Sequence, residues 1–170
     1  MSDKLSENAR LLAALRAAER RLQDDARPKA VAKQHALGKL MARERIAGLI
    51  DAGSLREIGA LLQPDRGTPE TRNVEAPADG VVVGTARIDG RPVAVIAFDF
   101  TVLGGSNGLA ARAKINRQAE WCVAHGRPFV MLLDGGGHRI QEGLDSAHFA
   151  GGSPFFEVQG RLSGWRRCAR

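Results

Sequence analysis

Apolar positions predict three β-strands in the centre of the chain. Residues 80–88 and 91–98 are rich in Val, Ile and Ala and are separated only by Asp89-Gly90. Asp-Gly between two such runs predicts a hairpin, because a type I′ turn requires positive φ at both of its central residues. Residues 129–133 are all apolar, which predicts a short strand that is buried on both faces.

Apolar residues at helical spacing predict helices on either side of these strands. The first helix, over residues 6–22, carries a narrow stripe of Leu and Ala, so we expect it to lie along a partner domain or subunit. The second begins at Pro28 or Ala36 and ends at Ile50, and Gly53 beyond it suits a left-handed cap. Residues 63–78 hold three prolines and few apolar side chains, which indicates a loop.

The third helix is predicted over residues 109–125 and ends at Gly126. Ser106 or Asn107 is placed to cap its first turn. Cys122 falls on its apolar stripe, which indicates a packed thiol and not a reactive one. The basic residues of the second and third helices are expected to form solvated faces: Lys33, Lys39, Arg43, Arg45, Arg112, Lys114 and Arg117. Alternatively, some of those on the second helix meet the phosphates of a cofactor.

Composition narrows the class of protein. The 170 residues are 44% hydrophobic and 26% charged, as in ordinary globular domains. There is no apolar run near the ~20 residues of a membrane span and no secretion signal at the start. Two cysteines form neither a disulfide framework nor a metal-binding spacing, so we expect a reducing compartment, the cytoplasm.

The net charge of +6 does not indicate a nucleic-acid-binding protein. Residues 1–50 carry +5, residues 51–160 carry −3, and the last ten carry +4. The central part, where the strands lie, is therefore slightly acidic. Aromatic residues do not alternate with the basic ones, as base stacking would require. We expect neither nucleic acid nor membrane as a partner.

Two of the predicted strands each run into a glycine-rich loop. The first loop contains Gly104-Gly105-Ser106 and the second contains residues 134–139, Asp-Gly-Gly-Gly-His-Arg. The order of strand, loop, helix, strand and loop predicts a βαβ unit whose two loops share the C-terminal edge of a parallel pair. Bare backbone N–H groups there form an anion-binding concavity. Tight turns without a ligand are the alternative, and two convergent loops favour the ligand.

Side-chain chemistry is sparse around these loops. The four histidines, at positions 35, 125, 138 and 148, lack metal-ligand spacing, so no metal is expected. Ser106 and Ser153 lack the Gly-x-Ser-x-Gly setting of a nucleophile. The loops match neither a P-loop nor Gly-x-Gly-x-x-Gly. The chemistry that these loops still suit is stabilisation of an enolate or thioester oxyanion by backbone N–H groups.

Five motifs carry a resemblance to a known family. They are Lys39–Ile46 with Asp51–Ser54 and Glu57–Gly59, then Asp79–Val82, Asp89–Pro92, Asp99–Ser106 and Arg139–Gly143. In this order they resemble the β subunits of biotin-dependent acyl-CoA carboxylases, namely the propionyl-CoA, acetyl-CoA and methylcrotonoyl-CoA carboxylase carboxyltransferases. The resemblance implies an α/β crotonase-like fold, a ββα superhelix, here incomplete and with an N-terminal helical extension.

The resemblance also implies an activity and a site. Carboxyl is transferred from carboxybiotin, carried on a biotin carboxylase or biotin carboxyl carrier partner, to the α-carbon of a short-chain acyl-CoA, in a protein that forms homo-oligomers. By this resemblance, Gly104 and Gly105 are expected to donate backbone N–H groups to the oxyanion. The residues expected to contact CoA are Ser106, Gly135, Gly136, Gly137, His138, Arg139 and Ile140. Arg139 either pairs with CoA phosphate or with the internal acids Asp134 or Glu142, and Glu142 is expected to be structural.

Departures from the family pattern limit what is carried over. His138 stands where the family has a small residue, in Asp-Ser-Gly-Gly-Ala-Arg, and residues 149–156 follow the family's Gly-Tyr-Gly-rich turn only loosely. We divide the chain into a helical segment, residues 1–52, a partial crotonase-like domain, residues 53–165, and an aberrant basic tail, residues 166–170. The family continues beyond residue 165 into a second glycine loop and a biotin-binding half.

Three functions therefore stay open. The chain is a truncated carboxyltransferase subunit that is inactive on its own, a non-catalytic fragment or assembly module, or a crotonase-like CoA decarboxylase or hydrolase that needs no biotin.

Overall fold

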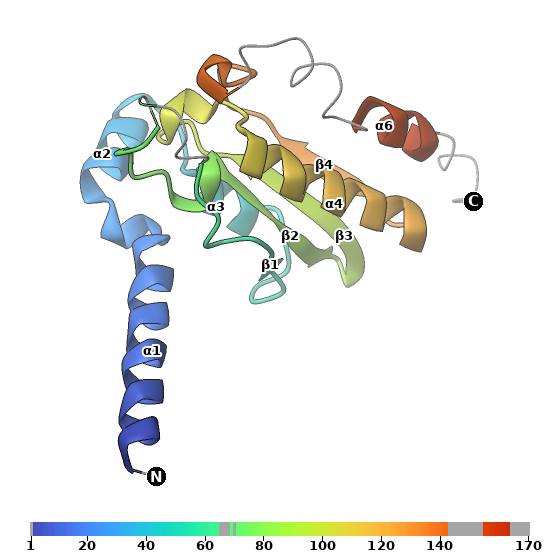
Figure 1. Ribbon diagram of the computed structural model, residues 1–170. Coiled ribbons are helices and arrows are strands. Elements are labelled where there is room, and N and C mark those ends of the chain that lie inside the picture. The colour runs from blue at the N-terminus through green and yellow to red at the C-terminus, as the bar shows by residue number, and fades with distance from the viewer. Residues whose placement is uncertain (1, 65–68, 70, 143–154, 164–170) are drawn as a thin grey trace.

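The computed structural model describes residues 2–64, 69, 71–142 and 155–163. These residues form a four-stranded sheet in the order β1-β2-β3-β4, with helices on both of its faces (Figure 1). The strands are β1 (Arg56–Glu57), β2 (Val81–Ile88), β3 (Arg91–Phe98) and β4 (Phe129–Leu132). The helices are α1 (Ser2–Arg21), α2 (Pro28–Ala36), α3 (Ala42–Ala47), α4 (Leu109–His125) and α6 (Phe155–Ser163).

The predicted hairpin is confirmed. Strands β2 and β3 pair antiparallel from Val81 opposite Phe98 to Ile88 opposite Arg91. Asp89 and Gly90 between them both have positive φ, 49° and 74°, as the type I′ turn requires. The predicted βαβ unit is also confirmed, because β3 pairs parallel with β4 and α4 connects the two strands.

Two apolar clusters hold the layers together. On one face of the sheet, Ala42 and Ile46 of α3 pack against Val82, Val95 and their neighbours. On the other face, Ala111 and Ile115 of α4 pack against Val83, Ile96 and their neighbours. Strand β3 is therefore buried on both faces, as its sequence of successive apolar residues requires.

Strand β4 differs from the prediction of complete burial. All four of its residues are only partly buried, and Leu133 after it is 70% exposed. No strand pairs with its outer edge within the described residues. The Phe155 ring of α6 packs beside Phe129, with ring centroids 5.9 Å apart, so α6 covers β4 only in part.

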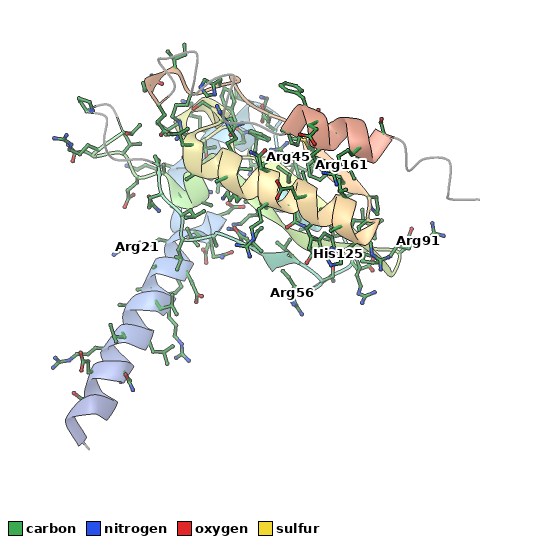
Figure 2. The ribbon with its side chains drawn as sticks, turned by 45° about the vertical axis from the view of Figure 1, so that its right-hand side comes forward. Arg21, Arg45, Arg56, Arg91, His125 and Arg161 are labelled. Atoms are coloured by element: carbon green, nitrogen blue, oxygen red, sulfur yellow. The ribbon has the colours of Figure 1, made fainter. Side chains whose placement is uncertain are left out.

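The N-terminal helix α1 projects away from the rest of the molecule in both views (Figures 1 and 2). Its predicted apolar stripe is largely exposed, since Leu11 and Leu15 are 63% and 43% accessible, and only Leu22 beyond its end is buried. That this stripe lies along a partner stays a prediction.

The prediction of one continuous second helix is wrong. The structure has two helices in this part of the chain, α2 and α3, because the chain turns at Gly38 with φ of 70°. Met41, which is 1% exposed, precedes α3 and donates its N–H to the Glu44 carboxylate at 2.7 Å. Gly53 does adopt φ of 70° but lies in a turn beyond α3, which ends at Ala47.

The solvated face predicted for Arg43 and Arg45 is also wrong. Arg43 donates to both oxygens of Glu57, at 2.7 and 3.0 Å. Arg45 donates to the Phe98 and Leu132 carbonyls, because α3 lies against the C-terminal ends of β3 and β4. Arg56 and Arg91, in contrast, project from the periphery (Figure 2).

Candidate functional site

The two glycine loops meet at one edge of the sheet, as predicted. The Gly136 N–H donates to the Gly104 carbonyl at 3.0 Å. A short parallel bridge extends this contact, since the Asn107 N–H donates to Gly137 O at 2.7 Å and the Arg139 N–H donates to Asn107 O at 3.0 Å. The loops that follow β3 and β4 are therefore one hydrogen-bonded unit.

Gly105 and Gly135 allow this close approach. A Cβ atom on Gly105 would lie 2.2 Å from the Asp134 carbonyl oxygen, and one on Gly135 would lie 2.2 Å from the Gly105 carbonyl oxygen. Both obstacles are backbone atoms that cannot move aside without separating the loops. Gly105 also has φ of 65°, which side chains rarely adopt.

An open cavity of about 600 Å³ lies beside the joined loops. Its wall combines backbone of the loops with aromatic and polar side chains: Phe98, Gly105, Asn107, Arg112, Leu133, Asp134, Gly135, Gly137, His138, Phe155 and Phe156. Of the residues predicted to contact CoA, Gly135, Gly137 and His138 line this cavity. Ser106, Gly136, Arg139 and Ile140 do not, and Ile140 is 68% exposed at the start of a short 3-10 turn.

The backbone N–H groups of the loops divide into two sets. The Gly105 N–H donates to Val102 O at 2.9 Å, so it is engaged in its own turn, and the Gly136 N–H is engaged with Gly104 O. The N–H groups of Gly104, Gly135 and Gly137 have no acceptor within the described residues. Gly135 and Gly137 line the cavity, so their N–H groups are available there to an anionic or polarised oxygen, whereas Gly104 is exposed and not part of the lining.

A buried ionic cluster of Asp79, Arg139 and Glu142 supports the loops from behind. Arg139 is 1% exposed and donates Nη1 to the carboxylates of Asp79 and Glu142, the latter at 2.8 Å. Its Nε and Nη2 bond the hydroxyl and carbonyl oxygens of Ser106, at 3.1 and 2.9 Å. Of the alternatives left open for Arg139, the structure shows pairing with internal acids, Glu142 and Asp79 in place of Asp134.

The same two carboxylates cap helix α4, which corrects the prediction that Ser106 or Asn107 does so. Glu142 Oε2 accepts the Leu109 N–H at 2.8 Å, and Asp79 Oδ2 accepts the Ala111 N–H at 2.7 Å. Residue Gly108 occupies the N-cap position and has no side chain to offer. Glu142 is therefore structural, as expected, and remote residues supply the capping that local sequence did not.

Asp79 is held in a left-handed segment of the backbone. Ala78, Asp79 and Gly80 have φ of 53°, 49° and 73°. Burial raises the pKa of the Asp79 carboxyl, and the hydrogen bond and charge of Arg139 oppose that rise. Lys114 of α4 secures the segment, since its Nζ donates to the carbonyls of Ala78, at 2.5 Å, and Val81.

The prediction that the basic residues of α4 form a solvated face is wrong for two of the three. Arg112 and Lys114 are 6% and 3% exposed, and only Arg117 is exposed. Arg112 lies three and seven residues before Ile115 and Ala119 of the buried stripe, a spacing that could have identified it. Lys114 is buried because the carbonyls of the left-handed segment accept its ammonium hydrogens.

Burial lowers the pKa of the Lys114 amine to about 8, and this makes stability depend on pH. Between pH 8 and 10.5 the unfolded chain keeps a proton that the folded chain has released, so the free energy of unfolding rises with pH. We expect a rise of about 3 kcal/mol across this range relative to Lys114→Met.

Urea denaturation of both proteins from pH 7 to 10.5 measures the difference. Cys122 is buried, as predicted, and its thiol pKa, raised by burial to about 11, acts in the opposite direction above pH 9. It does so equally in both proteins, so subtraction removes its contribution. A difference that stays constant with pH would contradict the assignment to Lys114.

His138 joins α4 to the cavity wall. Arg112 Nη2 lies 2.7 Å from His138 Nδ1, so the guanidinium donates to a neutral ring. Burial, followed by the charge of Arg112, lowers the pKa of His138, which keeps the imidazole neutral near pH 7. The bulk expected of His138 in the pocket is therefore present, and Arg112 fixes its orientation.

The described residues offer few other sites. No group of three or more His, Cys, Asp or Glu among them could hold a metal ion. None of the helices in this part of the chain is both long and apolar enough to cross a lipid bilayer.

Comparison with solved structures identifies the class of fold. The transcarboxylase 12S hexamer core with hydrolysed methylmalonyl-CoA bound superimposes with a TM-score of 0.77 and 38% identity, over 92% of this chain and 29% of that chain. A single-chain long-chain acyl-CoA carboxylase superimposes with a TM-score of 0.78 and 32% identity, over 89% of this chain and 16% of that chain. The fold is that of the crotonase-like carboxyltransferases.

Sequence comparison identifies the family. Residues 33–164 match the carboxyl transferase domain, and the chain belongs to this family. It is 42% identical over 134 residues to the methylmalonyl-CoA carboxyltransferase 12S subunit of Propionibacterium freudenreichii subsp. shermanii, covering 79% of this chain. It is 46% identical over 118 residues to the biotin-dependent acetyl-/propionyl-coenzyme A carboxylase beta5 subunit of Mycobacterium tuberculosis, covering 69% of this chain. The chain matches only 25% and 21% of the length of these relatives.

Proposed function

We propose that this chain provides the acyl-CoA-binding part of a biotin-dependent carboxyltransferase, which transfers a carboxyl group to the α-carbon of a short-chain acyl-CoA. One observation carries the proposal. The two glycine loops are joined at the C-terminal edge of the parallel strands β3 and β4, beside a cavity of about 600 Å³. Ligands of α/β sheets bind at this edge.

The N–H groups of Gly135 and Gly137, which line the cavity, are the proposed donors to the thioester oxygen. Negative charge develops on that oxygen when the α-carbon loses its proton, and fixed N–H dipoles stabilise it. The Gly105 N–H is hydrogen-bonded to Val102 O, so Gly105 contributes instead by letting the two loops approach each other closely. His138 forms the wall beside the thioester. Arg139 supports the first loop through its hydrogen bonds to Ser106.

The aromatic wall of the cavity fits the rest of such a substrate. Phe98, Phe155 and Phe156 lie on its lining and offer apolar surface to an acyl chain. Carboxybiotin, carried on a biotin carboxylase or biotin carboxyl carrier partner, supplies the carboxyl group. We assign no residue of this chain to the biotin ring, and we expect the complete assembly to be a cytoplasmic homo-oligomer.

Calorimetric titration of the purified chain with propionyl-CoA tests this proposal. We expect saturable binding, and we expect no carboxylation when free carboxybiotin is added, because the chain matches only about a quarter of its relatives' length. Absence of binding at millimolar propionyl-CoA would contradict the proposal. Turnover with carboxybiotin would show instead that the chain is catalytically sufficient.

A decarboxylase is the second candidate, because two relatives are of that kind. The chain is 44% identical over 130 residues to the methylmalonyl-CoA decarboxylase subunit alpha of Veillonella parvula, covering 76% of this chain and 25% of that protein. It also superimposes on a malonate decarboxylase heterodimer with a TM-score of 0.53 and 31% identity. Release of CO₂ from malonyl-CoA or methylmalonyl-CoA without biotin would favour this candidate.

A further inference from the structure

Each glycine loop begins with an aspartate that follows a strand. Asp99 directly follows β3, and Asp134 lies two residues after β4. Neither carboxylate is left to solvent, since their side chains are 9% and 18% exposed. Both are held by cations from one short part of the chain, residues 27–39, which contains α2. In Figure 1, α2 lies at the same end of the molecule as the loop that precedes α4.

Arg27, immediately before α2, holds the first aspartate. Its Nη2 lies 2.8 Å from Asp99 Oδ2, and its Nη1 donates to Thr101 Oγ1 at 3.1 Å. Asp99 Oδ1 in turn accepts the Thr101 N–H at 3.0 Å. The guanidinium therefore binds both the strand end and the start of the first glycine loop.

Lys39, three residues after α2, holds the second aspartate. Its Nζ lies 3.0 Å from Asp134 Oδ1 and 4.8 Å from the centroid of the Phe100 ring, which belongs to the first loop segment. Gln34 of α2 adds a weaker contact, 3.4 Å from Asp134 Oδ2. One ammonium group therefore contacts the segments that lead into both loops.

We infer that α2 is a strut that fixes the spacing of the two glycine loops, with Arg27 and Lys39 as its positioning residues. An α-helix keeps its ends at a fixed separation, and here Arg27 just before α2 and Lys39 just after it each bind the aspartate that starts one loop. The Lys39 pair is too exposed to add much to global stability. Its effect falls on the geometry of the N–H donors, and for substrate binding this inference rests on the proposed function.

Hydrogen exchange tests the strut without any ligand. The Gly136 N–H bonds Gly104 O across the two loops, so its exchange rate reports their separation. We expect Arg27→Met and Lys39→Met each to raise that rate about tenfold while the amides of β3 are unchanged. Lys39→Arg keeps the positive charge, so we expect its Gly136 N–H to exchange as slowly as in the unsubstituted chain. Lys33→Met is the matched control on α2 itself, and we expect it to change nothing.

The double variant Arg27→Met/Lys39→Met separates a strut from two local contacts. A strut released at one end no longer acts, so we expect the double variant to exchange no faster than either single one. Multiplicative effects in the double variant, or an unchanged Gly136 rate in the single variants, would overturn the inference.

Titration with propionyl-CoA then links the strut to binding. We expect both single variants to bind several-fold more weakly than the unchanged chain, with Lys39→Arg close to it. Exchange that responds to the variants in a chain that binds no propionyl-CoA would contradict the proposed function and leave the strut intact. Binding that is equal in all variants would contradict the role of the strut in substrate binding.

Discussion

Gly105→Ala will reduce the affinity for propionyl-CoA about 100-fold, because displacing the N–H donors of the loops loses two or three hydrogen bonds to the ligand of about 1 kcal/mol each. The new Cβ atom would lie 2.2 Å from the Asp134 carbonyl oxygen and 2.8 Å from the Gly135 Cα atom. The loops must therefore separate, and the bond from Gly136 N–H to Gly104 O is lost with the arrangement of the N–H donors.

Gly90→Ala is the matched control for this substitution. Gly90 also has positive φ, 74°, but a Cβ atom there meets nothing within 4 Å. Both variants carry the same backbone strain, about 1–2 kcal/mol, and only Gly105→Ala adds the collision. Calorimetric titration of the two variants separates these effects, and equal affinities would show that the approach of the loops does not matter for binding.

Asp79→Asn will lower the free energy of unfolding by about 3–5 kcal/mol, the range for breaking a buried ion pair by removing one partner. The Asp79 side chain is fully buried, ion-pairs with Arg139 and accepts the Ala111 N–H. The amide keeps the size of the side chain but removes its charge, which leaves Arg139 with Glu142 alone. Because the free energy of unfolding of a domain is about 5–15 kcal/mol, a loss of this size removes a large share of the stability of the folded state.

Asp89→Asn is the matched control. Asp89 has the same φ as Asp79, 49°, and is exposed in the hairpin turn. Asn tolerates this backbone as well as Asp does, so the backbone contribution cancels between the two variants. Urea denaturation should show a change below about 0.5 kcal/mol for the control. A similarly small change for Asp79→Asn would mean that the ionic cluster does not stabilise the fold.

Features set by neighbouring residues were predictable from the sequence. The hairpin followed from Asp89-Gly90, and α4 followed from its apolar spacing and Gly126, which ends it with φ of 60°. The βαβ arrangement and the meeting of the glycine loops followed from the order of these elements. Each conclusion needed only local conformational preference and the handedness rule for parallel strands.

Features set by distant residues were not predictable in the same way. A polar residue on a helix reads as solvated, yet Lys114 is buried because a left-handed segment more than 30 residues earlier supplies carbonyl acceptors. Capping of α4 was sought in the adjacent Ser106 and Asn107, but the carboxylates come from Asp79 and Glu142. The division of α2 from α3 also depends on tertiary contacts, because Met41 is buried and Ile46 packs against the sheet.

The ion pairs around the glycine loops have a consequence for the order in which the chain folds. Asp79 and Arg139 are 60 residues apart, and Lys39 and Asp134 are 95 apart, whereas the β2–β3 hairpin closes over two residues. Contacts between distant residues require loop closure and form late. During synthesis the hairpin can form long before residue 142 is made. We therefore expect the glycine loops to become ordered last, after the sheet against which they are held.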